Sequence, residues 1–84
     1  MELTQEFEQA VANSEQLPER PSNEILLKLY GLFKQAKEGD NTQSEPGGFD
    51  FKAMAKHQAW KSQEGKSSED AMREYVDLVN SLMA

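Results

Sequence analysis

The sequence predicts an all-α domain made of four helices. Four segments carry apolar residues spaced three and four apart, and no segment alternates apolar and polar residues over a useful length. Prolines, glycines and polar clusters separate these segments. Because 84 residues are within the size of one domain, we expect a single domain over residues 1–84.

The first helix is expected over about residues 4–16, with Thr4 as its candidate cap. Its apolar residues fall on one stripe, formed by Leu3, Phe7, Ala10 and Val11. Pro18 and Pro21 follow, and each fixes its own φ and biases the preceding residue toward extended geometry. We therefore expect a stiff connector before the second helix.

The second helix is expected to begin at Ser22, a good N-cap, and to run to about residue 37. It stops near Gly39, and a polar connection follows over residues 39–50 that contains the turn signal Pro46-Gly47-Gly48. Connections of this length without regular structure are often functional.

The third helix is expected over about residues 51–62, with Asp50 as its cap. The fourth opens with Ser67-Ser68-Glu69-Asp70, which is similar to a capping box with Asp in place of Glu. Its apolar stripe comprises Met72, Tyr75, Val76, Val79, Leu82 and Met83.

The chain is acidic, but its charge is unevenly placed. Nine Lys or Arg residues against fifteen Asp or Glu residues give a net charge of −6, which argues against nucleic acid or an anionic membrane surface as a general partner. Eight of the nine cations lie in residues 20–66. A cationic middle in an acidic chain favours a specific anionic ligand, although a mixed, solvated surface explains the charge equally well.

Several protein classes are excluded by composition. The chain has no cysteine and one histidine, so we expect no disulfide scaffold and no metal site. The longest apolar run is Ile25-Leu26-Leu27, so we expect no stable insertion into a membrane. The acidic start, MELTQEFEQ, lacks the features of a secretory signal, and we expect a cytoplasmic protein.

The second helix has two apolar faces. Ile25, Leu29, Leu32 and Ala36 form one face, which is typical of a core seam. Leu26, Leu27, Tyr30, Phe33, Lys34 and Lys37 lie roughly opposite. This second face is either covered by other helices of the bundle or holds a ligand.

The mixture of residues on the second face favours a ligand. Cations on a buried face are costly unless they are paired. Aromatic rings stack on nucleobases, and lysine ammonium groups bind phosphates. Apolar residues one turn back, Leu26 and Leu27, would line a compartment behind this polar mouth. The face therefore suits an amphipathic ligand with a nucleotide at one end.

The residues of this helix also resemble a known family. Tyr30-Gly31-Leu32-Phe33-Lys34-Gln35-Ala36, followed by Gly39-Asp40, is similar to the YxxYKQAxxGD signature of acyl-CoA-binding proteins. Later segments match in order and spacing: Ala55-Lys56, Ala59-Trp60, Ser68-Glu69-Asp70-Ala71-Met72 and Tyr75. The similarity covers essentially the whole chain.

The resemblance implies an up-down-down-up four-helix bundle that binds long-chain fatty acyl-CoA as a monomer, without catalysis and without a cofactor. It implies that Tyr30, Lys34 and Lys56 hold the phosphate, that Phe33 stacks on adenine and that Tyr75 closes the site. Arg20 would be a peripheral phosphate contact. The acyl groove would be lined by Phe7, Val11, Leu26 and Leu27.

Three residues depart from the family pattern. Phe33 stands where tyrosine is common, Glu15 where many members have lysine, and His57 where tryptophan is common. We expect ligand binding to persist with a weaker grip on the head group. His57 has no Ser, Cys or metal partner at a recognised spacing, and we assign it no catalytic role.

Binding and buffering of medium- to long-chain acyl-CoA is therefore the leading hypothesis. A second hypothesis is a helical bundle whose apolar second face docks a partner helix. A third is thioester hydrolysis, for which the sequence offers no credible nucleophile.

Overall fold

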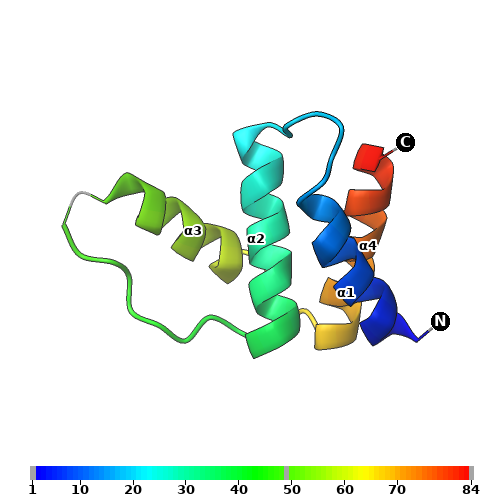
Figure 1. Cartoon of the computed structure of the whole chain (residues 1–84). Coiled ribbons are helices and arrows are strands. Elements are labelled where there is room, and N and C mark those ends of the chain that lie inside the picture. The colour runs from blue at the N-terminus through cyan, green and yellow to red at the C-terminus, as the bar shows by residue number, and fades with distance from the viewer. Residues whose placement is uncertain (1, 49, 84) are drawn as a thin grey trace.

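The computed structural model describes residues 2–48 and 50–83 of the chain. These residues form four helices and no strand: α1 (Leu3–Ser14), α2 (Asn23–Glu38), α3 (Phe51–Lys61) and α4 (Ser68–Met83) (Figure 1). α1 and α4 run in one direction, and α2 and α3 run in the other. The predicted four-helix, all-α fold is confirmed, and each predicted helix end lies within two residues of the observed one.

α2 is the central helix of the bundle. It packs against α4 on one side and α3 on the other, and α1 packs against α4. Over the described residues, α3 contacts α2 but neither α1 nor α4. Figure 1 shows the result: α3 leaves the bundle at a steep angle, and the long connection from α2 arcs around it. The α2–α3 pair is therefore open on the flanks that α1 and α4 do not cover.

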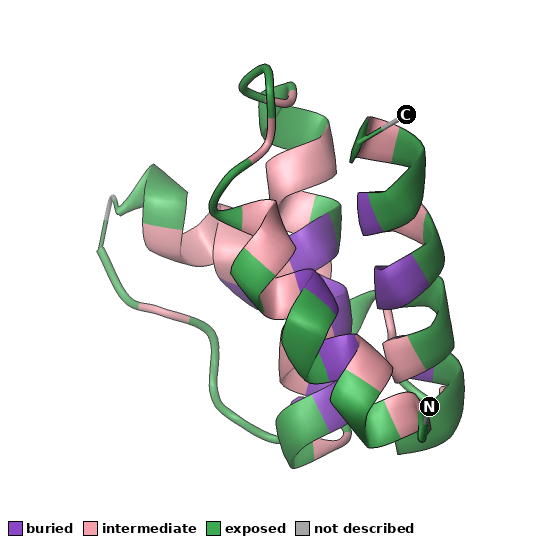
Figure 2. Ribbon diagram, turned by 45° about the vertical axis from the view of Figure 1, so that its right-hand side comes forward, coloured by how far each residue is buried: buried purple, intermediate pink, exposed green. Residues whose placement is uncertain are grey.

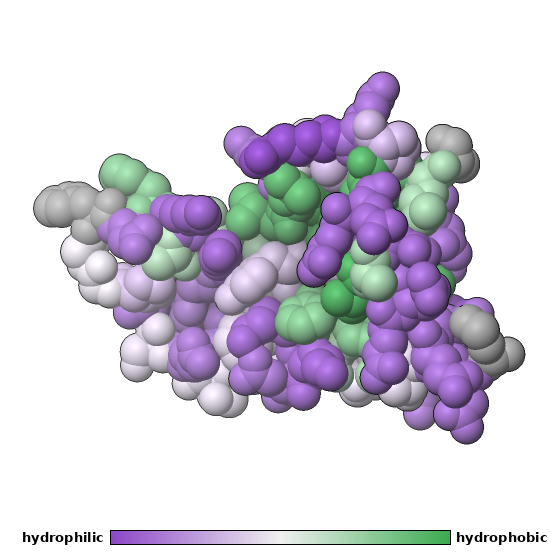
Figure 3. All heavy atoms as spheres, in the orientation of Figure 1, coloured by the Kyte–Doolittle hydropathy of each residue, from purple (hydrophilic) through white to green (hydrophobic). Residues whose placement is uncertain are grey.

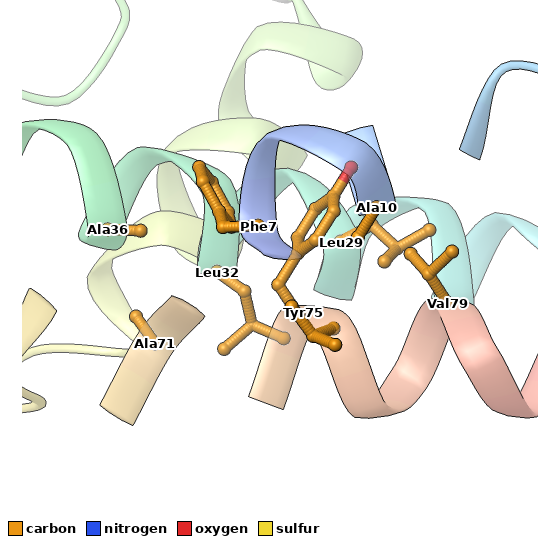
Figure 4. Packing of buried hydrophobic residues seen from close by; sticks show 9 residues of the cluster. Phe7, Ala10, Leu29, Leu32, Ala36, Ala71, Tyr75 and Val79 are labelled. Carbon is orange, nitrogen blue, oxygen red and sulfur yellow. The ribbon is translucent and has the colours of Figure 1, made fainter. Parts of the chain in front are cut away.

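The hydrophobic core lies between α1, α2 and α4 (Figures 2 and 4). Its buried members are Phe7, Ala10, Leu29, Leu32, Ala36, Ala71, Tyr75, Val76 and Val79. The predicted core seam of α2 is confirmed, with Ile25 partly buried against the same cluster. α3 contributes no residue to this cluster, so its position depends on its contacts with α2 and with the connection.

Short polar side chains begin three of the helices, as predicted. The Ser22 hydroxyl accepts a hydrogen bond from the Ile25 N–H, and Asp50 accepts one from the Ala53 N–H. Ser67 accepts the N–H of Asp70. The predicted cap at Thr4 is wrong: α1 begins at Leu3, and the capping position before it makes no side-chain hydrogen bond.

Three residues of the motif over residues 30–40, Gln35, Gly39 and Asp40, stabilise the fold. Gln35 is 1% exposed, and its Nε2 donates to Asp40 Oδ1 and to the Lys66 carbonyl, both at 2.8 Å. Asp40 Oδ1 also accepts the Gly65 N–H at 2.8 Å. Gly39, at φ 80°, ends α2 in a conformation that favours glycine. This latch fixes the end of α2 to the turn before α4.

The latch predicts a specific acid sensitivity. The Gly65 N–H, and secondly the Gln35 amide, hold the pKa of Asp40 below its ordinary value of 3.8. The folded chain then binds this proton at lower pH than the unfolded chain, so the stabilisation is present above about pH 4 and is lost as the pH falls further. Urea unfolding should show that Asp40→Ala lowers the free energy of unfolding at neutral pH and by less at about pH 3. An equal loss at both pH values would contradict this role.

Candidate ligand-binding site

A hollow of about 500 Å³ lies between α2 and α3, and we call it the central hollow. It is lined by Arg20, Asn23, Leu26, Leu27, Tyr30, Lys52, Ala55 and Lys56. Figure 3 shows hydrophobic atoms exposed over the upper part of α2 between α3 and α1, with hydrophilic residues around them.

The central hollow is cationic. Arg20, Lys52 and Lys56 all line it, and none of its lining residues is acidic, although the chain carries a net charge of −6. Lys56 is half-buried, and its Nζ lies 5.3 Å from the centroid of the Tyr30 ring. The face of an aromatic ring attracts a cation, so the Tyr30 ring favours this position of the Lys56 ammonium group. The hollow thus offers positive charge to an anionic ligand.

The same hollow has an apolar wall. Leu26 and Leu27 from α2 and Ala55 from α3 are all half-buried, and none belongs to the core cluster. Apolar side chains that line a hollow and do not fill the core remain available to a hydrophobic ligand. One hollow therefore combines an apolar wall with three cations.

Three further hollows share lining residues with the central one. The smallest, of about 210 Å³, lies between α3 and the connection from α2 and shares Tyr30 and Lys56. The loop hollow, of about 290 Å³, lies by the connection from α1 to α2 and shares Arg20 and Leu26 with the central hollow. The outer hollow, of about 460 Å³, lies along α2 and α3 and shares Leu27 and Ala55.

Lys34 lies beside Trp60, away from the lining of the central hollow. Its Nζ is 4.8 Å from the centroid of the Trp60 ring and forms an ion pair with Glu38. Trp60 is buried, and its Nε1 donates to the Gly39 carbonyl at 2.8 Å. In this structure Lys34 is therefore engaged by a carboxylate that an incoming anion would have to displace.

Phe33 belongs to an aromatic cluster with Phe7 and Tyr75. The Phe7 ring centroid lies 6.0 Å from that of Phe33 and 5.1 Å from that of Tyr75. Phe7 and Tyr75 are buried in the core (Figure 4), whereas Phe33 is half-buried against it. Val11 also packs against this core from α1. These four residues lie on the α1–α4 side of α2.

Tyr75 is linked to the loop hollow through its hydroxyl. The hydroxyl lies 3.2 Å from Ser14 Oγ, and Ser14 lines the loop hollow together with Glu15. Burial raises the pKa of Tyr75, the hydrogen bond to Ser14 opposes that shift, and the charge of Glu15 adds to it. Tyr75 is therefore a neutral donor at physiological pH.

The predicted site residues thus fall into two groups and a single side chain. The central hollow brings together Arg20, Leu26, Leu27, Tyr30 and Lys56. The aromatic cluster and its edge hold Phe7, Val11, Phe33 and Tyr75. Lys34 lies apart from both, against Trp60.

Sequence reasoning missed three residues of the central hollow. These are Asn23, Lys52 and Ala55, to which the sequence analysis assigns no ligand role. Lys52 precedes Lys56 by one helical turn, which places both on the same face of α3. That spacing was a usable signal for Lys52.

The described residues offer neither a metal site nor a membrane span. Within residues 2–48 and 50–83, no group of three or more His, Cys, Asp or Glu side chains could hold a metal ion. None of the described helices has the length and apolar character that a membrane crossing requires.

Comparison with known proteins identifies the family. The family model described as acyl CoA binding protein matches residues 4–79. Acyl-CoA-binding domain-containing protein 6 of Arabidopsis thaliana is 52% identical, over 99% of this chain and 90% of that protein. Acyl-CoA-binding protein homolog 1 of Caenorhabditis elegans is 48% identical, over 98% and 95%. The chain belongs to the acyl-CoA-binding protein family.

The fold of the acyl-CoA-binding protein family is also seen directly. The crystal structure of Oryza sativa acyl-CoA-binding protein 2 superposes with a TM-score of 0.92 at 46% identity, covering 96% of this chain and 90% of that chain. The expected bundle type is therefore confirmed.

His57 has a structural role in this fold. Asn41 Nδ2 lies 3.2 Å from both His57 Nδ1 and the His57 carbonyl oxygen, and Asn41 Oδ1 accepts the Gln43 N–H. Both side chains are buried. His57 therefore ties α3 to the connection from α2.

Proposed function

We propose that this protein binds medium- to long-chain fatty acyl-CoA esters without reacting them, and so transports and buffers them. The observation that supports this function best is the central hollow, which joins an apolar wall to three cations with no carboxylate in its lining. An acyl-CoA has the same two parts: an alkyl chain and a multiply charged nucleotide.

The acyl chain is proposed to lie against Leu26, Leu27 and Ala55. Burying an alkyl chain contributes roughly 0.8 kcal/mol per CH₂ before the costs of association. The predicted groove residues Phe7 and Val11 would contribute from the α1 side, where they already pack in or against the core.

The nucleotide is proposed to bind at the cationic side of the hollow. Arg20, Lys52 and Lys56 supply charge for the phosphates, and Tyr30 supplies a hydroxyl and a ring beside Lys56. The half-buried ring of Phe33 is the proposed platform for adenine, and the Tyr75 hydroxyl would close the site near Ser14.

The hollow is suited to binding and not to catalysis. Its lining contains no Ser, Cys or His side chain that could attack a thioester. The family description and the names of the relatives refer to binding, and the protein is accordingly not an enzyme. Binding of this kind requires no cofactor.

Isothermal titration with palmitoyl-CoA tests the proposal, with free CoA and palmitate as separate controls. We expect one-to-one binding of the ester and far weaker binding of either half, because only the ester occupies both parts of the hollow. Absence of ester binding would overturn the proposal and favour docking of a partner helix. CoA release on prolonged incubation would overturn the non-catalytic part.

Substitutions of the two members of the Lys34–Glu38 ion pair are expected to change ligand affinity in opposite directions. Lys34→Glu is expected to weaken palmitoyl-CoA binding, whereas Glu38→Gln is expected to strengthen it by about twofold, the value of one exposed ion pair. Titration of both variants at low salt measures the two effects. An unchanged dissociation constant for Lys34→Glu would remove Lys34 from the site.

We further propose that the carrier acts as a monomer in the cytoplasm. Among the described residues, the large hydrophobic side chains classed as exposed are Phe51 and Met83, on different helices. Two isolated side chains do not make the extended apolar patch that a stable dimer uses. Light scattering should give the mass of one chain; twice that mass would contradict a monomer.

A further inference from the structure

Three hollows adjoin the central hollow, and a long alkyl chain could continue into one of them. The hollow between α3 and the connection from α2 shares Tyr30 and the charged Lys56 with it. The loop hollow is lined by the carboxylates Glu15 and Glu19, and its shared residues include the charged Arg20. The outer hollow shares only Leu27 and Ala55 with the central hollow, and both are apolar. The outer hollow is therefore the one joined to the central hollow through apolar side chains alone, and this makes it the favoured continuation for a hydrocarbon chain.

The outer hollow continues the apolar wall along α3. Ala59 follows Ala55 by one helical turn and, like Ala55 and Leu27, is half-buried. Polar side chains surround these three residues: Glu24, Lys28, Gln58 and Ser62. The outer hollow is therefore a strip of apolar surface with a polar rim, which suits the uncharged end of an alkyl chain.

The strip ends beside a contact between the backbones of α2 and α3. A Cβ added to Gly31 would lie 2.8 Å from the carbonyl carbon of Ala59 and closer still to its oxygen. The two backbones are thus in direct contact at Gly31, and no alkyl chain passes between them there. This contact limits the length of chain that the strip covers.

We infer that the distal end of a long acyl chain crosses Leu27 and Ala55 into the outer hollow, and that this passage determines which chain lengths the protein prefers. The inference rests on the proposed function, since it concerns the same ligand. Chains short enough for the central hollow do not reach the passage. Each methylene beyond it adds about fourfold in affinity until the strip ends at Ala59.

Ala55→Leu tests the passage, because a larger side chain between the two hollows obstructs it. Affinity is measured by titration with octanoyl-, lauroyl-, palmitoyl- and arachidoyl-CoA below their micelle concentrations. We expect the ratio of arachidoyl-CoA to octanoyl-CoA affinity to fall by at least about tenfold, the value of about two methylenes. Ala12→Leu, an exposed position on α1 outside all the hollows, is the matched control and should leave the ratio unchanged.

Gln58→Leu tests the outer hollow and leaves the lining of the central hollow unchanged. Gln58 is exposed and lines only the outer hollow of those described above. We expect about fourfold tighter binding of arachidoyl-CoA and no change for octanoyl-CoA.

The outcomes separate this inference from the proposed function. If the unmodified protein binds no ester, both are overturned. If it binds the esters but Ala55→Leu weakens all lengths equally and Gln58→Leu changes none, the proposed function stands and the passage is overturned. Circular dichroism establishes that both variants remain folded, and Gln58→Leu decides the matter if Ala55→Leu does not fold.

Discussion

Replacing Lys56 by glutamate is expected to weaken palmitoyl-CoA binding by about 100-fold, because it removes a charge-assisted hydrogen bond and sets a like charge against the phosphates. Lys56 lines the central hollow, is half-buried and lies over the Tyr30 ring. The new carboxylate would share the lining of that hollow with Arg20 and Lys52, and it would compete with the phosphates for these two cations.

Lys61→Glu is the matched control for this variant. Lys61 is an exposed lysine on the same helix, it lines none of the hollows, and its reversal changes the net charge by the same amount. Titration should give a dissociation constant within about twofold of the unmodified protein for Lys61→Glu, since a distant exposed charge is screened by salt. Equal losses for both variants would mean that net charge, not the central hollow, determines binding.

The helices could be predicted from the sequence because their ends depend on local chemistry. The hydroxyl of Ser22 and the carboxylate of Asp50 cap α2 and α3 as expected, and these interactions involve residues three apart in the chain. The start of α1 was predicted wrongly because it has no such local signal. Its N-terminus lacks a side-chain cap, so nothing in the sequence marks Leu3 as the first residue.

The second face of α2 could be predicted only in part. Helical periodicity places Leu26, Tyr30 and Phe33 on one side, but it does not say which helix covers each of them. Phe33 packs with Phe7 and Tyr75, whereas Leu26 and Tyr30 line the central hollow. This division arises because α3 contacts α2 alone, which is a property of the tertiary arrangement and not of any local pattern.

Lys52 and Ala55 show a second limit. α3 carries no clear apolar stripe, and none of its residues joins the core cluster, so periodicity does not distinguish its inner face from its outer face. The i, i+4 spacing places Lys52 on the same face as Lys56, but the fact that this face lines the hollow follows only from the position of α3 beside α2.

Gly31 is where sequence and structure lead to opposite predictions. Glycine in a helix interior costs about 1 kcal/mol relative to alanine, so helix propensity alone predicts that Gly31→Ala stabilises the protein. In the structure, however, the added Cβ would collide with the backbone of Ala59, which has no flexible end to move aside. Overpacking costs about 1–3 kcal/mol, and a clash with backbone belongs at the upper end of that range. This cost exceeds the gain of about 1 kcal/mol in helix propensity.

We therefore expect Gly31→Ala to lower the free energy of unfolding by about 2 kcal/mol, and the midpoint of thermal unfolding by about 10 °C. Urea unfolding followed by fluorescence of Trp60, the single tryptophan, measures the change.

Gly47→Ala is the matched control, because no atom lies within 4 Å of its added Cβ and its φ is not positive; it should change stability by less than about 1 kcal/mol. If Gly31→Ala is as stable as Gly47→Ala, the helices are not in backbone contact at Gly31. If it is destabilised as expected, α3 can keep its helix only by moving away from α2, and palmitoyl-CoA affinity should fall with stability because both sides of the central hollow are then displaced.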